Sequence, residues 1–263
     1  MSRYERWNAL LDLVAANGHL NVAEAAHAVG VSEATIRRDL DQLAEQRMLT
    51  RTRGGAISTS QLAYDLPLLY KTARNAPEKQ LIGRAAAALI TPDTTVALNG
   101  GTTTVEVARA LVNRSELRDS QAASTITVVT NALSIAGELA VRPQIKLVVT
   151  GGVARPESHE LIGPLATYVL ADLTFDWAIL GVDGLDAVTG ATAHHEGEAS
   201  INRLMTQRAQ RVAIVADSSK LAKRAFARVC GIDEIDVVVT DATADNPAVA
   251  ALADKGVQVI TAA

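Results

Sequence analysis

The chain has 263 residues, a formal net charge of −4, 48% hydrophobic residues and only 3% aromatic residues. Its length suits two domains with sizeable cores, and no apolar run is long enough to cross a bilayer. Charged residues close to Met1 argue against a signal peptide, and the single cysteine, Cys230, excludes an internal disulfide. We therefore expect a cytoplasmic protein with no membrane segment.

Three short helical patterns open the chain. The first covers residues 7–14, where apolar side chains recur at helical spacing, and it is expected to end at Gly18. The second begins at Asn21, an N-cap residue followed three positions later by Glu24, as in a capping box. The third begins at Ser32, another N-cap type. This succession predicts a small three-helix module.

The third helix is expected to bury Ile36 and Leu40 and to present polar residues to the outside. The outer face then carries Thr35, Arg38, Asp39 and Gln42, with Arg37 beside them. A helix held by its apolar face, with polar residues early on its outer face, is typical of a recognition helix in the DNA major groove. We expect Ser32, Thr35, Arg37 and Arg38 to contact DNA, because arginine can pair with guanine and hydroxyl groups can reach phosphates.

A β-hairpin wing is predicted to follow. Arg51 and Arg53 alternate with threonines, and Gly54-Gly55 permits a tight turn, so both arginines are expected on one face and against DNA. Residues 1–56 hold seven basic and seven acidic side chains, but clustered arginines on a neutral module can still bind phosphates. The alternative is a packing module whose charged face is merely solvated.

A connector separates this module from the rest of the chain. Residues 58–60 are polar, and Pro67 and Pro77 interrupt helical continuity. We therefore predict an α+β winged helix-turn-helix domain over residues 1–57, a linker over 58–77 and a second domain over 78–263.

The second domain alternates short β-branched runs with helical patterns, which predicts an α/β domain with a mainly parallel sheet covered on both faces. The expected strands are Val96–Leu98, Thr127–Val129, Lys146–Val149, Ala178–Leu180, Val212–Val215, Val237–Val239 and Val257–Ile260. Polar and glycine-rich residues follow five of these strands. Because ligands bind at the carboxyl ends of strands in open α/β sheets, we expect a ligand at this edge.

The residue types at this edge indicate a phosphorylated sugar. Residues 99–103 lead from a strand into a helix N-terminus, which favours an anion, and Lys220 adds positive charge. Carboxylates suit sugar hydroxyl groups, and the absence of a GK[ST] ending argues against a nucleoside triphosphate. The predicted effector-binding residues are Asn99, Gly100, Gly101, Thr102, Thr103, Asn131, Gly151, Gly152, Asp183, Glu198, Asp217 and Lys220.

Residues 31–40 and 51–56 resemble the winged helix-turn-helix signature of the DeoR family of regulators. The resemblance extends over nearly the whole chain, through segments 78–79, 99–103, 130–131, 150–152, 198–199 and 216–220. It implies a sensor domain related in fold to ribose-5-phosphate isomerase and an effector that is a phosphorylated sugar or polyol. Two positions depart from the family pattern: Arg47 stands where glycine is frequent, and Ala25 where leucine is usual.

An isomerase-like enzyme with an attached DNA-binding domain is the alternative. Asp183-Gly184-Leu185-Asp186 is close to the isomerase family's Asp-Gly-Ala-Asp, and Glu198 lies near the position of its base. The isomerase family's Lys-Gly-Gly-Gly run is missing, however, since residues 187–192 read Ala-Val-Thr-Gly-Ala-Thr. Losing that lysine removes an electrophilic partner, so we expect a sensor and no enzyme.

The segment His194-His195-Glu196-Gly197-Glu198 raises a metal site as a third possibility. Adjacent histidines usually point apart and the HExxH spacing is absent, so we expect no metal and no cofactor. The expected partners are double-stranded operator DNA, the sugar or polyol phosphate, and further copies of the chain in a dimer or tetramer. The family resemblance implies a repressor that its effector releases from DNA.

Overall fold

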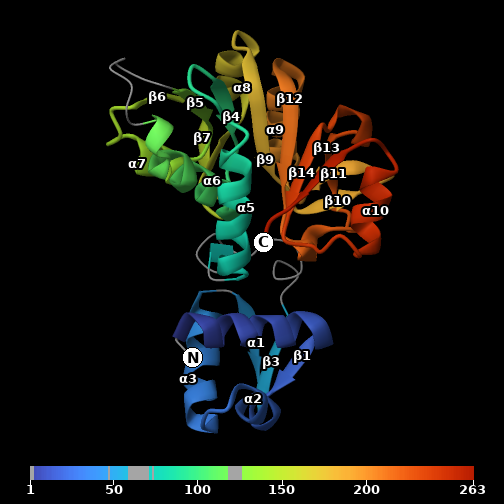
Figure 1. Ribbon diagram of the computed structural model, residues 1–263. Coiled ribbons are helices and arrows are strands. Elements are labelled where there is room, and N and C mark those ends of the chain that lie inside the picture. Colours follow the sequence, from blue (N-terminus) through green and yellow to red (C-terminus); the bar gives the residue numbers. More distant parts are fainter. Residues whose placement is uncertain (1–2, 47, 59–70, 73, 118–125) are drawn as a thin grey trace. The chain divides into compact units, whose positions relative to one another are not determined.

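The computed structural model describes residues 3–46, 48–58, 71–72, 74–117 and 126–263. The chain forms two compact units, Met1–Arg74 and Asn75–Ala263, which are best followed separately (Figure 1). Most of the expected linker, residues 59–70 and 73, lies outside the described residues, as does Arg47.

Over residues 3–58, as far as the structure describes them, the N-terminal unit combines three helices with a small antiparallel sheet of order β1-β3-β2. Its elements are α1 (Arg3–Asn17), β1 (His19–Asn21), α2 (Val22–Val29), α3 (Glu33–Glu45), β2 (Leu49–Thr52) and β3 (Gly55–Ser58). Gly18, with a φ of 74°, ends α1, and the Asn21 side chain caps α2 by accepting the Ala23 N–H at 2.8 Å. Gly30, with a φ of 72°, turns the chain from α2 towards α3.

One hydrophobic core holds this unit together. Trp7, Leu10, Ile36 and Leu40 are buried where α1 and α3 meet. Gly55 on β3 lies directly against β1, because a Cβ atom there would come within 1.8 Å of the Leu20 carbonyl oxygen. This close approach ties the wing hairpin to the strand between α1 and α2.

The C-terminal unit is built on a seven-stranded sheet of order β15-β14-β12-β9-β4-β5-β6, in which every neighbouring pair is parallel. Its strands are β4 (Thr95–Leu98), β5 (Ile126–Thr130), β6 (Ile145–Val149), β9 (Phe175–Gly181), β12 (Ala209–Val215), β14 (Val237–Thr240) and β15 (Gln258–Thr261). The strand order reverses direction at β4 and β9. That reversal is the topological switch point at which open α/β sheets bind ligands.

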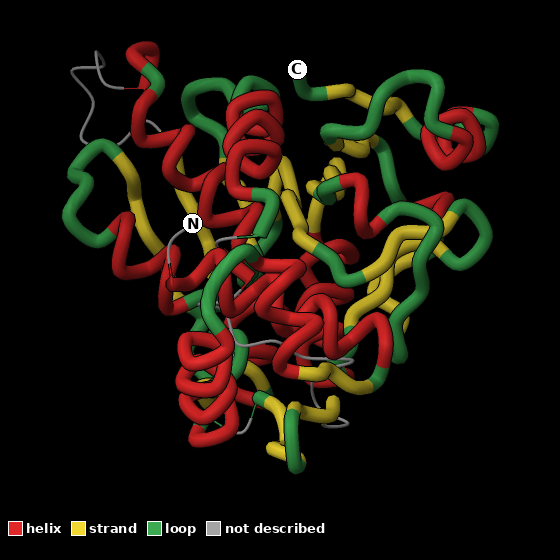
Figure 2. Tube along the Cα trace, turned by 90° about the horizontal axis from the view of Figure 1, so that it is seen from below, coloured by secondary structure: helices red, strands yellow, loops and turns green. Residues whose placement is uncertain are grey.

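Helices cover both faces of this sheet, so successive strand residues enter two separate cores. Val96, Leu98 and Ile179 pack with the helices of one face, whereas Ala97 and Leu180 pack with those of the other. The first set is α5 (Ala76–Ala87), α6 (Thr102–Asn113) and α7 (Leu133–Leu139), and the second is α8 (Pro164–Ala171), α9 (Glu196–Arg208) and α10 (Pro247–Ala253). The alternation of helix and strand can be followed along the Cα trace (Figure 2).

Shorter elements lie between these layers. Three 3₁₀ helices, η1 (Ser115–Leu117), η2 (Ser218–Lys220) and η3 (Ile232–Glu234), connect longer elements. A hairpin pairs β7 (Val153–Arg155) with β8 (Glu160–Ile162), and a small antiparallel sheet joins β10 (Gly184–Asp186), β11 (Gly190–Ala193) and β13 (Ala227–Cys230).

The fold class predicted from the sequence is confirmed, and all seven strands expected in the second domain belong to the parallel sheet. The hairpin β7–β8, the small sheet and the strand β1 were not predicted, because these short strands lack the continuous β-branched runs that marked the parallel strands. No helix within the described ranges is both long and apolar enough to span a membrane.

Candidate functional site

The N-terminus of α3 is the first place where predicted site residues come together. The Ser32 hydroxyl caps the helix by accepting the Thr35 N–H at 3.2 Å, and it also lies 2.9 Å from the Thr35 hydroxyl. Ser32 is exposed, so this end of the helix faces solvent. Free N–H groups and the helix dipole make such an end suitable for a phosphate group.

Two arginines follow on the same helix, and they differ in their contacts within the protein. Arg37 pairs with Glu33 at 2.6 Å, and both side chains are about half exposed. Arg38 is exposed and makes no hydrogen bond or ion pair with any residue that the structure describes. Because screened surface pairs are weak, both guanidinium groups remain available to an external anion.

Asp39 does not lie on the outer face of α3, which corrects the prediction made from helical spacing. It is 3% exposed and accepts hydrogen bonds from Arg6 at 2.5 and 3.0 Å and from the Trp7 indole at 2.8 Å. The hydrogen bond to Asp39 raises the pKa of the Arg6 guanidinium against the effect of its burial. Through these hydrogen bonds Asp39 links α3 to α1. The part of α3 that α1 covers is therefore wider than its apolar residues alone suggest.

The two wing arginines lie in different surroundings. Arg51 pairs with Asp41 of α3 at 2.7 Å and donates a hydrogen bond to the Gly55 carbonyl, so it braces the hairpin. Arg53 occupies the exposed turn beside Gly54 and makes no such contact within the described part of the chain. Arg53 is therefore the wing side chain that is free to reach a partner.

The second group of predicted residues lies at the carboxyl edge of the parallel sheet. Asn99, directly after β4, is 1% exposed and bonds both backbone groups of Gly181 at the end of β9. Its amide donates to the Gly181 carbonyl at 2.9 Å and accepts the Gly181 N–H at 2.8 Å. Asn99 therefore holds the two strand ends together at the switch point, with its side chain occupied by the protein.

The Gly100-Gly101 loop leads from β4 into α6. Gly101 has a φ of 136°, which favours glycine, and α6 begins at Thr102 with no side-chain cap. Thr103 is buried, whereas Thr102 is partly exposed at the helix start. An uncapped helix N-terminus behind two glycines presents backbone N–H groups to an anion at close range.

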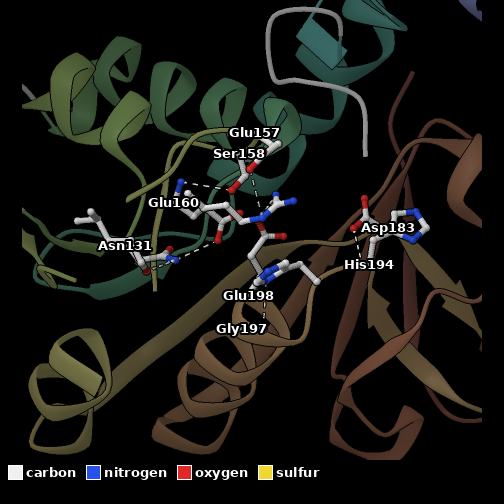
Figure 3. Close-up of polar contacts among 11 residues, drawn as sticks. Asn131, Glu157, Ser158, Glu160, Asp183, His194, Gly197 and Glu198 are labelled. Carbon is white, nitrogen blue, oxygen red and sulfur yellow. Dashed lines mark hydrogen bonds and ion pairs between the residues drawn. The ribbon is translucent and has the colours of Figure 1, made fainter. Parts of the chain in front are cut away.

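A buried polar cluster lies against this loop, and most of it was not predicted (Figure 3). Arg155 of β7 donates to Glu198 of α9 at 3.0 Å, with side chains only 12% and 10% exposed, and lies 3.6 Å from Glu157. Glu160 of β8 accepts a hydrogen bond from Asn131 at 2.9 Å. The close-up shows Asn131, Glu160 and Glu198 directed toward one another.

Glu160 has the most perturbed environment of this cluster. It is 4% exposed, and a Cβ atom on Gly100 would come within 2.6 Å of its Oε1 atom. Burial, together with the charges of Glu198 and Asp183, raises the pKa of Glu160 to about 8, although hydrogen bonds from Asn131 and the Gly100 backbone oppose that shift. Near neutral pH the Glu160 carboxyl is therefore mainly in its uncharged form.

Two further predicted acids lie along the same edge. Asp183 accepts the His194 N–H at 3.0 Å and lies 3.7 Å from the Lys220 ammonium. Asp217 receives a hydrogen bond from Asn75 at 3.1 Å and another from Ser219. Burial alone would raise the pKa of Asp217, but these hydrogen bonds and the charges of Lys79 and Lys220 lower it overall.

Gly151 and Gly152, also predicted to bind the effector, turn the chain from β6 into the hairpin. Their φ angles are 71° and 127°, and a Cβ atom on Gly152 would come within 2.8 Å of the Ile162 carbonyl oxygen. This packing gives both glycines a structural reason to be present. His195 likewise has a local role, since its Nδ1 atom accepts the Gly197 N–H at 3.1 Å and caps α9. Within the described ranges, no group of three His, Cys, Asp or Glu side chains is placed to hold a metal ion.

The structure thus brings Glu198, Glu160 and Asp183 close enough for their charges to interact, with Arg155 bound to Glu198. Lys220 lies near Asp183, and its charge also acts on Asp217. Sequence reasoning missed Arg155 and Glu160. One feature of the sequence could have indicated these two residues. The charged stretch that contains them lies between Gly152 and Gly163, and glycines that bound a short polar segment favour turns on either side of it.

Comparison with known proteins places both parts of the chain. The DeoR-like helix-turn-helix domain family matches residues 6–62, and the DeoR C-terminal sensor domain family matches residues 74–242. The HTH-type transcriptional regulator GlpR of Haloferax volcanii is 33% identical over 257 residues, which is 97% of this chain and 96% of the relative. The glycerol-3-phosphate regulon repressor of Escherichia coli K12 is 31% identical over 258 residues and 98% of each chain.

Among solved structures, ribose 5-phosphate isomerase A of Methanocaldococcus jannaschii superposes with a TM-score of 0.41 and 20% identity, over 56% of this chain and 54% of the isomerase.

Proposed function

The chain belongs to the DeoR family of transcriptional regulators, and from this membership we propose that it is a repressor that binds operator DNA through residues 1–57 and leaves it when residues 78–263 bind a phosphorylated sugar or polyol. The chain is a DNA-binding regulator with an effector-binding domain. Its relatives are transcriptional regulators and not enzymes.

The uncapped start of α6 behind Gly100-Gly101, set beside buried acids, supports the effector class. Backbone N–H groups at Thr102 and Thr103 suit a phosphate dianion, and Lys220, which follows β12 at the same edge of the sheet, supplies positive charge. Glu198 and Asp183 suit the hydroxyl groups of a carbon chain. A ligand with a phosphate at one end and hydroxyl groups at the other satisfies both parts of this edge.

The isomerase-like segment supports sensing better than catalysis. Asp186, the second acid of Asp183-Gly184-Leu185-Asp186, accepts the N–H groups of Val188 and Thr189 at 3.0 and 2.9 Å, so it organises a turn. Burial opposes these bonds, which nonetheless lower the pKa of Asp186 to about 2 together with the contact to Arg224. An acid so firmly held in its charged form is poorly suited to transfer protons near neutral pH.

On the DNA side, we propose that the N-terminus of α3 enters the major groove, with Arg38 reading base edges and Arg37 assisting. Ser32 and Thr35 bond each other at the helix start and would present their hydroxyls to the backbone. Arg53 would contact phosphate from the wing, while Arg51 fixes the wing to α3. We also propose a homo-oligomer, since an operator with two-fold symmetry requires two copies of the DNA-binding unit.

Coupling between the two domains requires that the effector bind one arrangement of the oligomer more tightly than the other. The test uses the purified full-length chain and DNA fragments selected from a random pool by binding to it. Glycerol 3-phosphate, ribose 5-phosphate and fructose 6-phosphate, each beside its unphosphorylated form, are screened for thermal stabilisation and for release of that DNA. Stabilisation and release by a phosphorylated compound alone would support the proposal. Tight DNA binding that no phosphorylated compound changes would overturn the effector class.

A further inference from the structure

Three acids converge where the loops after β4, β5 and β9 meet the β7–β8 hairpin, and two of them pair with a cation. Arg155 is bound to Glu198 at 3.0 Å and Lys220 lies 3.7 Å from Asp183. Among the described residues, the third acid, Glu160, accepts hydrogen bonds from neutral groups, the Asn131 amide and the Gly100 backbone. Since buried like charges without a counter-ion cannot all stay ionised, this arrangement leaves Glu160 as the acid that carries a proton.

Asn131 supplies a second and independent observation. Its side chain is fully buried and directed toward Glu160, and its Nδ2 atom donates to Glu160 and to the Leu161 carbonyl (Figure 3). Its Oδ1 atom is buried without a hydrogen-bond partner among the described residues. A buried acceptor left open is costly, so it points to a partner that arrives from outside.

We propose that Glu160 and Asn131 form a hydroxyl-recognising subsite of the effector pocket, in which the uncharged Glu160 carboxyl donates to one hydroxyl oxygen and Asn131 Oδ1 accepts that hydroxyl's hydrogen. A hydroxyl group both accepts and donates, so it is the one common sugar substituent that satisfies both residues. Sites that must bond a hydroxyl group discriminate strongly against ligands that lack it. This subsite therefore determines which carbon chain is accepted, and the inference rests on the proposed function.

The proposal makes effector binding depend on the Glu160 proton. The groups that face Glu160 are Glu198 on α9, Asp183 after β9, Asn131 after β5 and the Gly100 N–H after β4, with Arg155 opposite it in its own hairpin. The pKa of about 8 places the loss of the proton above neutral pH. Between pH 7 and pH 9 the protonated fraction falls by roughly tenfold.

The experiment measures calorimetric dissociation constants of the full-length chain for glycerol 3-phosphate, ribose 5-phosphate, fructose 6-phosphate and inorganic phosphate at pH 7 and pH 9. The expected result is about tenfold weaker binding of the preferred carbon compound at pH 9, with no comparable change for inorganic phosphate. Glu160→Gln, which keeps a donor but cannot ionise, should bind at pH 7 within a few-fold of the unmodified chain and lose the pH dependence. Glu157→Gln, on the same hairpin but more exposed, should behave like the unmodified chain.

The outcomes separate this inference from the proposed function. Binding of a carbon compound with no pH dependence, or with equal dependence in Glu160→Gln, overturns the subsite and leaves the effector class standing. Binding of inorganic phosphate alone overturns the subsite and retains the anion site. Binding of none of the four compounds overturns the effector class, and the subsite with it. If Glu160→Gln does not fold, the pH dependence of the unmodified chain still tests the subsite.

Discussion

Asn99 pairs with both backbone groups of Gly181, at 2.9 and 2.8 Å, across the point where the order of the parallel strands reverses. The register of β4 and β9 ends at Leu98 and Ile179, and the Asn99 side chain continues the hydrogen bonding between the two strands beyond that pair. The Gly100-Gly101 loop and the residues after Gly181 thus start from a fixed separation. The predicted ligand-binding edge is organised by a residue whose own amide is already occupied.

We expect Asn99→Ala to destabilise the C-terminal unit by about 2–4 kcal/mol, because two backbone groups of the partly buried Gly181 lose their partner. Hydrogen–deuterium exchange of peptides from β4 and β9 would measure the change in the free energy of unfolding. Asn246→Ala removes a comparable amide from the cap of α10, which bonds only the Ala248 N–H, and should cost about 1 kcal/mol. Equal effects of the two substitutions would contradict the special role of Asn99.

Asp39→Ala should destabilise the N-terminal unit by roughly 3–5 kcal/mol, because it leaves Arg6 and the Trp7 indole without their acceptor. Exchange rates of peptides from α1 and α3 provide the measurement. Asp41→Ala removes an acid that is 60% exposed and pairs with Arg51, and it should cost less than about 1 kcal/mol. If Asp39→Ala behaved like Asp41→Ala, the burial of Asp39 would have no energetic consequence.

Arg38→Ala should weaken binding to the selected DNA by about 1–3 kcal/mol and relax its sequence preference, if Arg38 reads a base edge. Arg53→Ala should instead weaken binding to all sequences and reduce the salt slope of the binding constant by about 1. Fluorescence anisotropy over a range of KCl concentrations separates these effects. Arg84→Ala, an exposed arginine of α5, serves as the control and should change neither quantity.

Thr102→Val removes the hydroxyl at the start of α6 and keeps the backbone N–H, whereas Lys220→Ala removes the positive charge that we assign to the phosphate. Each substitution should weaken the effector response by roughly tenfold or more. DNA affinity without effector should stay unchanged. The measurement is the concentration of sugar phosphate that releases half of the bound DNA. Lys223→Ala removes an exposed neighbouring cation and should leave that concentration as it was. A loss of DNA binding in both site variants would indicate misfolding and argue against the assignment.

The pKa of Glu160, about 8 in the folded chain against an ordinary glutamate pKa of 4.5, links the stability of the C-terminal unit to pH. Because the folded state holds this proton more tightly than the unfolded state, the free energy of unfolding should fall as pH rises from about 4.5 to 8. Glu160→Gln should lack this component, which is worth at most about 1.4 kcal/mol per pH unit. Hydrogen–deuterium exchange should be measured between about pH 4.5 and 8 for the unmodified chain and for Glu160→Gln, with Glu157→Gln as the control. As pH rises, the free energy of unfolding should fall more steeply for the unmodified chain and for Glu157→Gln than for Glu160→Gln.

Regular spacing explains what could be predicted from the sequence. The inner strands of the parallel sheet contain continuous apolar runs, since both faces are covered, so Val96–Leu98 or Val237–Val239 could be recognised without any partner strand. The polar residues after those strands could also be recognised, and the expected ligand edge follows from them because parallel strands end at one edge of the sheet. Asp39 was misplaced because helical spacing says which residues share a face but not how wide an arc a neighbouring helix covers.

Long-range contacts explain the rest. Arg155 and Glu160 meet Glu198 and Asn131 only after the β7–β8 hairpin folds back over strands far away in sequence. Arg51 could be read as a DNA contact because nothing in its local sequence reveals its bond to Asp41. The sequence shows which side chains are available, and the tertiary contacts decide which of them are already occupied.

The contact between Gly55 and the Leu20 carbonyl oxygen has a consequence for the cost of binding DNA. Strand β3 packs against the backbone of β1, which joins α1 to α2, and Arg51 of the same hairpin pairs with Asp41 of α3. The distance between the tip of the wing and the N-terminus of α3 is therefore fixed in the free protein. Little conformational entropy then has to be lost when both meet the double helix. The DNA-binding unit is thus preorganised, with the spacing between its wing and its recognition helix fixed before DNA binds. A bulky side chain at position 55 would disturb that spacing and should reduce the affinity for DNA, although residue 55 itself need not contact the DNA.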